Sequence, residues 1–316
     1  MKVITLHHPH QMKQKDFPPL SIALGFFDGV HLGHQKVIMT AQDYAVSHGV
    51  KSAVMTFDPH PSVVLSSKKS SVQYLSSLDQ KIRKIEKMGV DYLLIVRFTS
   101  AFASLEPQEF VDQYLIGIHA VHITAGFDYS YGKFGRGKME TLPFHARGKF
   151  TSSTVEKQED ENEKISSTRI RELLSNGNPS KAAQLLGNYH ETEGLVVHGE
   201  KRGRKIGFPT ANIDTSNGLM IPSAGVYAVK MKVSDVWHDG ICNVGYKPTF
   251  NDPDHAKLSV EVHLFDYNES IYGEHVEVQW IERIRSEQKF NGVDELIAQI
   301  EKDKNKAIAI LARHLS

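Results

Sequence analysis

Cysteine is nearly absent from this chain of 316 residues, in which Cys242 is the only one. A single cysteine excludes an intramolecular disulfide and argues against a cysteine-based zinc site. Long apolar runs are absent too: none approaches the length of a membrane-spanning helix, and residues 1–11 lack the apolar core of a signal peptide. We therefore expect a cytoplasmic protein with no membrane partner.

Net charge is also missing, because lysine plus arginine and aspartate plus glutamate number 37 each. No global field draws such a protein to nucleic acid, so we expect no nucleic-acid partner and only local binding of phosphate. The chain is long enough for two hydrophobic cores. His7, His8 and His10 could suggest a metal site, but they flank Pro9 without carboxylate or cysteine support, and we interpret them as surface histidines.

The most informative stretch is residues 25–34, Gly-Phe-Phe-Asp-Gly-Val-His-Leu-Gly-His. An apolar run before it predicts a buried strand, the glycines predict a turn, and residues 35–48 predict a helix. His31 and His34 then lie at a helix N-terminus, where backbone N–H groups and the helix dipole favour an anion. The alternative is a pair of helix-capping histidines in a glycine turn.

The first half continues as alternating strands and helices, which predicts a Rossmann-like domain with a mostly parallel sheet. Residues 50–57 form one such strand, which ends at Asp58-Pro59-His60-Pro61. The prolines end the ladder and hold a rigid loop at the carboxyl end of the strand, where open α/β sheets bind ligands.

Two later segments also carry ligand-binding residue types. Residues 126–137 contain glycines whose spacing does not fit a dinucleotide fingerprint, so a flexible loop with aromatic side chains that could stack on a ring is the simpler interpretation. Residues 165–171, Ile-Ser-Ser-Thr-Arg-Ile-Arg, open a helix. They predict either a second anion site or a plain serine cap with two surface arginines.

From Gly194 onward, short runs rich in β-formers predict a small antiparallel barrel, followed by a terminal helix whose apolar stripe packs on it. Residues 199–212, Gly-Glu-Lys-Arg-Gly-Arg-Lys-Ile-Gly-Phe-Pro-Thr-Ala-Asn, have the composition of a flexible basic loop. Glu261 alternates with Val260 and Val262, so it faces away from them. A solvated strand glutamate would show the same alternation.

These motifs, in this order and spacing, resemble those of bacterial bifunctional riboflavin kinase/FAD synthetases, from about Ile22 to the terminal helix. The resemblance implies an FMN adenylyltransferase domain over residues 1–186 and a riboflavin kinase domain over residues 187–316. It also implies riboflavin, FMN, FAD and ATP as ligands, ATP as co-substrate and Mg²⁺ as cofactor. We expect a monomer or a weak homo-oligomer.

In the first domain, the resemblance implies that His31, His34 and Arg169 clamp the ATP triphosphate while the FMN phosphate attacks the α-phosphate. Further ATP contacts are implied for Gly25, Phe26, Asp28, Gly33, Ser167 and Thr168. Flavin contacts are implied for Asp58, Pro59, His60, Pro61, Asp128 and Tyr129. Tyr129 and Tyr131 replace the usual phenylalanines of this segment.

In the second domain, the resemblance implies that Glu261 activates the 5′-hydroxyl of riboflavin. Thr210 and Asn212 would hold magnesium, Phe208 and Pro209 would contact the flavin, and the loop with Gly199, Gly203, Arg204 and Gly207 would cover ATP. Two other hypotheses are a related nucleotidylyltransferase that shares His-x-Gly-His, and a non-catalytic flavin-binding regulator. The first would not need the Gly-Phe-Pro-Thr-Ala-Asn motif.

Overall fold

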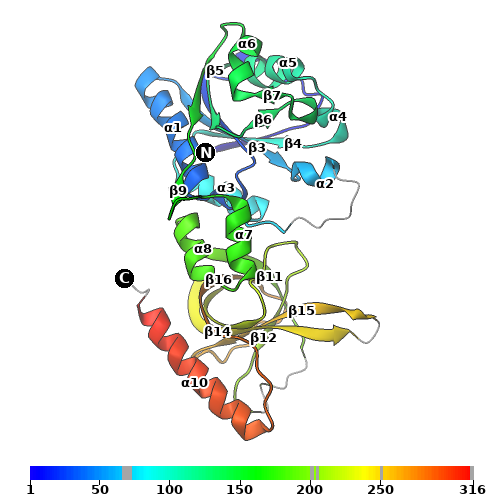
Figure 1. The fold of residues 1–316 in the computed structure, drawn as a ribbon, viewed down its shortest axis with the longest axis vertical. Coiled ribbons are helices and arrows are strands. Elements are labelled where there is room, and N and C mark those ends of the chain that lie inside the picture. Colours follow the sequence, from blue (N-terminus) through cyan, green and yellow to red (C-terminus); the bar gives the residue numbers. More distant parts are fainter. Residues whose placement is uncertain (66–72, 200–202, 204–205, 250–251, 314–316) are drawn as a thin grey trace. The chain divides into compact units, whose positions relative to one another are not determined.

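The computed structural model describes the chain except for residues 66–72, 200–202, 204–205, 250–251 and 314–316, and, within β14 and β15, the side chains of residues 247–257 (Figure 1). Its contacts divide it into two compact units, Met1–Val72 with Ser76–Ser166, and Gln73–Leu75 with Ser167–Ser316. Each unit has its own buried apolar core. Within the described ranges, no helix is both long enough and apolar enough to cross a membrane.

The first unit is built on a six-stranded sheet in the order β1-β4-β3-β2-β5-β8, with every neighbouring pair parallel. The strands are β1 Lys2–Leu6, β2 Leu20–Leu24, β3 Lys51–Asp58, β4 Tyr92–Arg97, β5 Ala120–Gly126 and β8 Thr151–Val155. The small hairpins are β6 Ser130–Tyr131 with β7 Gly137–Lys138, and β9 Glu159–Asp160 with β10 Glu163–Lys164. The predicted Rossmann-like parallel sheet is confirmed, and β1 is a strand that the sequence analysis missed.

Helices cover this sheet in two layers. They are α1 Leu32–His48, α2 Pro61–Leu65, α3 Leu78–Lys87, α4 Ser100–Ala103, α5 Pro107–Phe110 and α6 Leu142–Ala146. Short helical turns are η1 Gln14–Asp16, η2 Asp28–Val30, η3 Val111–Leu115, η4 Ile116–Ile118, η5 Lys133–Gly135 and η6 Met139–Thr141. Ile22 and Leu24 join one apolar cluster and Ala23 the other, because successive side chains of a strand point to opposite faces.

The second unit contains a closed antiparallel barrel in the order β11-β12-β15-β14-β13-β16, with β16 pairing back to β11. Its strands are β11 His190–Val197, β12 Ala211–Asp214, β13 Gly225–Val233, β14 Val236–Thr249, β15 Asp252–Leu264 and β16 His275–Arg285. Tyr227 and Trp280 are fully buried and meet edge to face, with ring centroids 5.4 Å apart. The predicted small barrel is confirmed.

The terminal helix α10, Val293–Ala312, packs against β13, β14 and β16 on the outside of the barrel (Figure 1). Its Ala307, Ile310 and Leu311 are fully buried in an apolar cluster with residues of these strands. Asp303 of the same helix is almost fully buried and forms a two-pronged ion pair with Arg285 of β16, at 2.8 Å. The predicted terminal helix on the barrel is therefore confirmed.

Two short helices, α7 Ser167–Ser175 and α8 Pro179–Leu186, belong to the unit that contains the barrel. The backbone of Ser223 donates to the carbonyl of Leu174 at 3.1 Å, and a Cβ on Gly177 would lie 2.9 Å from Arg283. The compact units thus divide after Ser166. The division of the two activities between residues 186 and 187 concerns function and stays a prediction.

Candidate active sites

The turn between β2 and α1, residues 25–30, has an unusual backbone. Phe27, Gly29 and Val30 all have positive φ, at 56°, 76° and 51°. A Cβ on Gly25 would lie 2.8 Å from the ring of Phe27, so only glycine fits there. Positive φ at bulky residues persists only where the surroundings hold it, which marks this turn as a candidate functional segment.

His31 and His34 lie together at the start of α1. The rings stack with centroids 3.5 Å apart and planes inclined by 17°. His31 is the N-cap, because its Nδ1 accepts a hydrogen bond from the backbone N–H of His34 at 3.2 Å. An accepting Nδ1 places the proton of the neutral His31 ring on Nε2. The capping interpretation is correct for His31 and does not account for the ring of His34.

His34 is held in its neutral form. Burial lowers its pKa well below 6.5, and the charges of His31, Lys81 and Lys164 lower the pKa further. Its Nδ1 is buried and has no hydrogen-bond partner among the residues that the structure describes. At neutral pH this side chain can donate or accept a hydrogen bond through its ring nitrogens. It lacks the second ring proton that a charged imidazolium would give as a general acid.

The predicted ATP contacts of this segment lie close together. A Cβ on Gly33 would lie 3.2 Å from the His31 ring, so the backbone comes close to the histidines there. Asp28 is buried and accepts a hydrogen bond from the backbone of Ser76 at 3.3 Å. The carbonyl of Phe26 accepts from Thr56 Oγ1 at 2.8 Å. These contacts fix the turn, and they give Asp28 a structural role beside its predicted one.

Other loops at the carboxyl ends of the strands meet this turn. The His60 ring, after β3, packs edge to face on the Phe26 ring at 4.4 Å, although the two residues are 34 positions apart. Asp58 forms an ion pair with Arg97, and the Asp58–Pro59 peptide that leads towards Pro61 is cis. The structure therefore brings one predicted flavin loop against the predicted ATP turn.

The tyrosines that replace phenylalanines have different roles. Tyr131 is buried, and its hydroxyl lies 2.7 Å from His145 Nδ1, a hydrogen bond that phenylalanine could not make. Burial raises the pKa of Tyr129, so its phenol stays neutral. Asp128 forms an ion pair with Lys164. The segment is thus partly ordered by polar contacts of its own.

In the barrel, strand register brings Asn212 and Glu261 together. Glu261 of β15 lies directly opposite Asn212 of β12 on one side and Asn243 of β14 on the other. Directly opposed residues of neighbouring strands point to the same face, and the adjacent Val260 and Val262 fill the barrel interior. The three polar residues form a row on the outer face. Glu261 is half-buried, with Ser259 Oγ donating to Oε1 at 3.2 Å.

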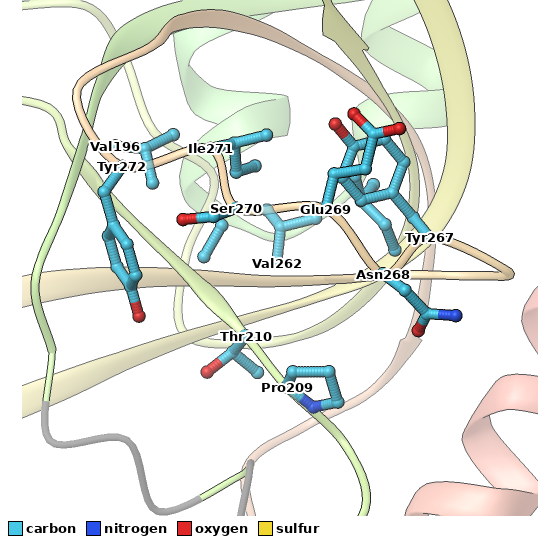
Figure 2. Close-up of a pocket in the computed structure, with 12 residues that line it drawn as sticks. Val196, Pro209, Thr210, Val262, Tyr267, Asn268, Glu269, Ser270, Ile271 and Tyr272 are labelled. Atoms are coloured by element: carbon cyan, nitrogen blue, oxygen red, sulfur yellow. The ribbon is translucent and has the colours of Figure 1, made fainter.

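A cavity of about 270 Å³ lies on the opposite face of these strands, because its lining includes Ala211 and Val262, which alternate with Asn212 and Glu261. Figure 2 shows Tyr267 and Tyr272 on opposite sides of it, with Thr210 and Pro209 on a further wall. The remaining lining comes from β11, β12, β15 and the loop after β15, namely Val196, Ala211, Val262, Leu264, Asn268, Glu269, Ser270 and Ile271. Residues 267–272 were not among the predicted site residues, although two tyrosines after the predicted catalytic strand were a usable signal.

The glycines before β12 lie against the backbone and side chains of this site. A Cβ on Gly199 would lie 2.2 Å from Asn212 Nδ2, and a Cβ on Gly203 would lie 2.2 Å from the carbonyl of Phe208. Gly207 has φ 87°. Each therefore needs to be glycine for a steric or conformational reason. Arg204 lies outside the described residues.

The aromatic and proline residues of the motif are held by His263. Phe208 is buried and contacts the His263 ring at 5.4 Å, while the carbonyl of Pro209 accepts from His263 Nδ1 at 2.8 Å. Thr210, the next residue in the chain, lines the cavity.

The comparisons with known proteins follow this division. The FAD synthetase family model matches residues 13–169 and the riboflavin kinase family model matches residues 186–311. Two curated relatives are named bifunctional riboflavin kinase/FMN adenylyltransferase. The Bacillus subtilis (strain 168) protein is 49% identical over 98% of each chain, and the Listeria monocytogenes protein is 50% identical over 99% of each.

The chain belongs to the bifunctional riboflavin kinase/FMN adenylyltransferase family. It is a transferase with an FAD synthetase domain followed by a riboflavin kinase domain. A crystal structure from Streptococcus pneumoniae, named as a macrolide-efflux protein, is 36% identical and superposes with a TM-score of 0.86. The superposition covers 96% of this chain and 98% of the Streptococcus pneumoniae chain.

Family membership decides between the hypotheses that the sequence left open. A nucleotidylyltransferase that shares only His-x-Gly-His does not account for the second matched domain. The full-length relatives named for both activities favour a bifunctional enzyme over a non-catalytic regulator.

The predicted phosphate-binding residues of α7 and the two histidines of α1 belong to different compact units. Ser167, Thr168 and Arg169 occupy the first turn of α7, which confirms the predicted helix start. They belong to the second compact unit, whereas His31 and His34 belong to the first. The predicted clamp on the triphosphate therefore stays a prediction.

Metal-binding side chains are numerous in this enzyme, with 17 histidines and 37 acidic residues, but they are dispersed over the part of the chain that the structure describes. Over the described ranges, no three His, Cys, Asp or Glu side chains gather as they would around a metal ion. Of the three histidines interpreted as surface residues, His7 is exposed, whereas His8 and His10 are half-buried beside Tyr114, with the His10 and Tyr114 rings 4.6 Å apart. Thr210, Asn212 and Glu261 offer hydroxyl, amide and carboxylate oxygens, the donors that Mg²⁺ prefers.

Proposed function

We propose that the FAD synthetase domain transfers AMP at residues 25–34. The phosphate of FMN attacks the α-phosphorus of ATP, a new P–O–P bond forms, and pyrophosphate leaves. The first backbone N–H groups of α1 and the Nε2–H of His31 are donors for the charge that develops on the phosphate. The stacked histidine pair at the start of a 17-residue helix, in which burial keeps His34 neutral, carries this proposal.

The other predicted residues would complete this site. Ser167, Thr168 and Arg169 would bind the β- and γ-phosphates, because hydroxyls and a guanidinium at a helix start form an anion site. The loop of residues 58–61, together with Asp128 and Tyr129, would contact the flavin. The contact between the rings of His60 and Phe26 supports a flavin position next to the ATP turn.

For the kinase domain we propose Glu261 as the general base that accepts the proton of the riboflavin 5′-hydroxyl. The 5′-oxygen of riboflavin then attacks the γ-phosphorus of ATP, and ADP leaves. The shared face of Glu261 and Asn212 supports this assignment. Thr210 and Asn212 would hold Mg²⁺, which supplies positive charge to the phosphates when bound. The cavity between Thr210 and the two tyrosines would take the purine of ATP.

Three further points are proposals of the same kind. The boundary between the activities near residue 186 agrees with the start of the riboflavin kinase match. A cytoplasmic location is proposed from the sequence. The balanced charge supports the proposal of no nucleic-acid partner, and a monomer or weak homo-oligomer is proposed as well.

The test uses the full-length enzyme with two single substitutions, His34→Ala and Glu261→Gln. The wild-type protein, given riboflavin, ATP and Mg²⁺, should form FMN and then FAD, which chromatography separates. His34→Ala should accumulate FMN, and Glu261→Gln should make FAD only from added FMN. Loss of both activities in either variant would overturn the assignment of that residue to one site.

A further inference from the structure

A buried lysine lies behind the 25–30 turn. Lys81 of α3 is 3% exposed, and its Nζ donates to the carbonyl of Phe26 at 2.8 Å and to Thr56 Oγ1 at 3.4 Å. The ammonium group also lies 4.0 Å from the centroid of the Phe26 ring. Lysine is among the residues least often fully buried, so this position needs an explanation.

The same side of the turn is tied by other residues of α3 and of the segment before it. The backbone N–H of Gly29 donates to Ser76 Oγ at 3.0 Å. Lys84 Nζ lies 3.5 Å from the carbonyl of Gly29. Together with Lys81, these contacts hold a backbone with three positive φ values, which would relax without support.

Charged groups surround Lys81. The carboxylates of Asp28, in the turn, and Asp58, at the end of β3, favour its charged form, but burial outweighs them and lowers the pKa of Lys81 to about 8. The ammonium form therefore predominates at neutral pH. Its charge is in turn one of the causes, after burial and His31, that lower the pKa of His34 in α1.

We propose that Lys81 is a positioning residue for adenylyl transfer, because its ammonium group fixes the Phe26 carbonyl and so aims the N–H groups of the 25–30 turn at the nucleotide. The inference rests on the proposed function of this turn. A buried charge is costly, and an apolar side chain of similar length would fill the same space without that cost. Stability alone therefore gives no reason for a lysine here.

The test compares Lys81→Met with the wild-type enzyme. Because a misplaced phosphate site slows chemistry, kcat for FMN adenylylation should fall about tenfold or more, with a smaller change in KM for FMN. The acid limb of the pH profile should move to higher pH, because the pKa of His34 rises when the nearby cation is removed. The melting temperature and riboflavin phosphorylation should be unchanged. Lys87→Met, on the exposed side of α3, is the matched control.

Each contrary result has a definite meaning. A Lys81→Met protein that melts earlier or fails to fold would make Lys81 a stability residue and overturn the inference. Normal adenylylation in Lys81→Met, with activity lost in His34→Ala, would overturn this inference alone. Normal adenylylation in His34→Ala would overturn the proposed function of the turn.

Discussion

Replacing Gly199 with alanine tests how closely the loop before β12 approaches the proposed magnesium ligand. The new Cβ would lie 2.2, 2.4 and 2.6 Å from three side-chain atoms of Asn212, where ordinary contacts begin near 3.4 Å. One of the two groups must then move by about 1 Å, a misplacement that can cost about a hundredfold in rate. The kinase rate of Gly199→Ala should fall by that order.

The assay measures FMN formed from riboflavin, with adenylylation of added FMN as an internal control that should not change. Gly292→Ala is the matched variant, because a Cβ on Gly292 meets nothing within 4 Å and its φ is extended. Gly199→Ala with normal kinase turnover would show that Asn212 is not held by this contact. An equal loss in Gly292→Ala would show that any alanine in the barrel unit has this effect.

Three other predictions use different observables. Glu261→Gln should lower riboflavin phosphorylation about a hundredfold, the scale of a positioned base, while flavin binding by fluorescence titration stays near normal; an unimpaired rate would return Glu261 to the solvated-strand interpretation. Burial and the charge of His48 lower the pKa of His122 from 6.5 to about 4, so only the unfolded chain takes up this proton as pH falls from 6.5 to 4. The free energy of unfolding should therefore fall as pH drops through that window, by about 3 kcal/mol at pH 4 relative to its value above pH 6.5. The measurement is the temperature at which adenylylation activity is half lost, taken at several pH values. In His122→Gln this temperature should fall less between pH 6.5 and pH 4 than in the wild-type enzyme. Asp303→Ala leaves the Arg285 guanidinium without its buried carboxylate, so the free energy of unfolding should fall by about 3 kcal/mol or more. Urea unfolding followed by tryptophan fluorescence reports this change, because both tryptophans lie in the unit that contains the barrel. An unchanged urea midpoint would contradict the prediction.

The sequence by itself determined many of the elements and the family, although it did not reveal β1. The buried run of β2 and the helix after it follow from apolar periodicity, which is a local property of the chain. The alternation around Glu261 correctly placed it away from the interior, because the side-chain period of a strand is fixed. The motifs also identified both domains that the family models match.

Only the tertiary structure decided which residues meet. The pairing of Asn212 with Glu261 depends on strand register, and the contact of His60 with Phe26 depends on the order of parallel strands. Neither register nor strand order is written in a local pattern. Lys81 sits in a helix rich in charged residues, and it is buried because α3 packs against the 25–30 turn, where Lys81 Nζ reaches the carbonyl of Phe26, 55 positions earlier. Long-range packing sets the environment, and the environment sets the pKa values and hydrogen bonds on which the chemistry depends.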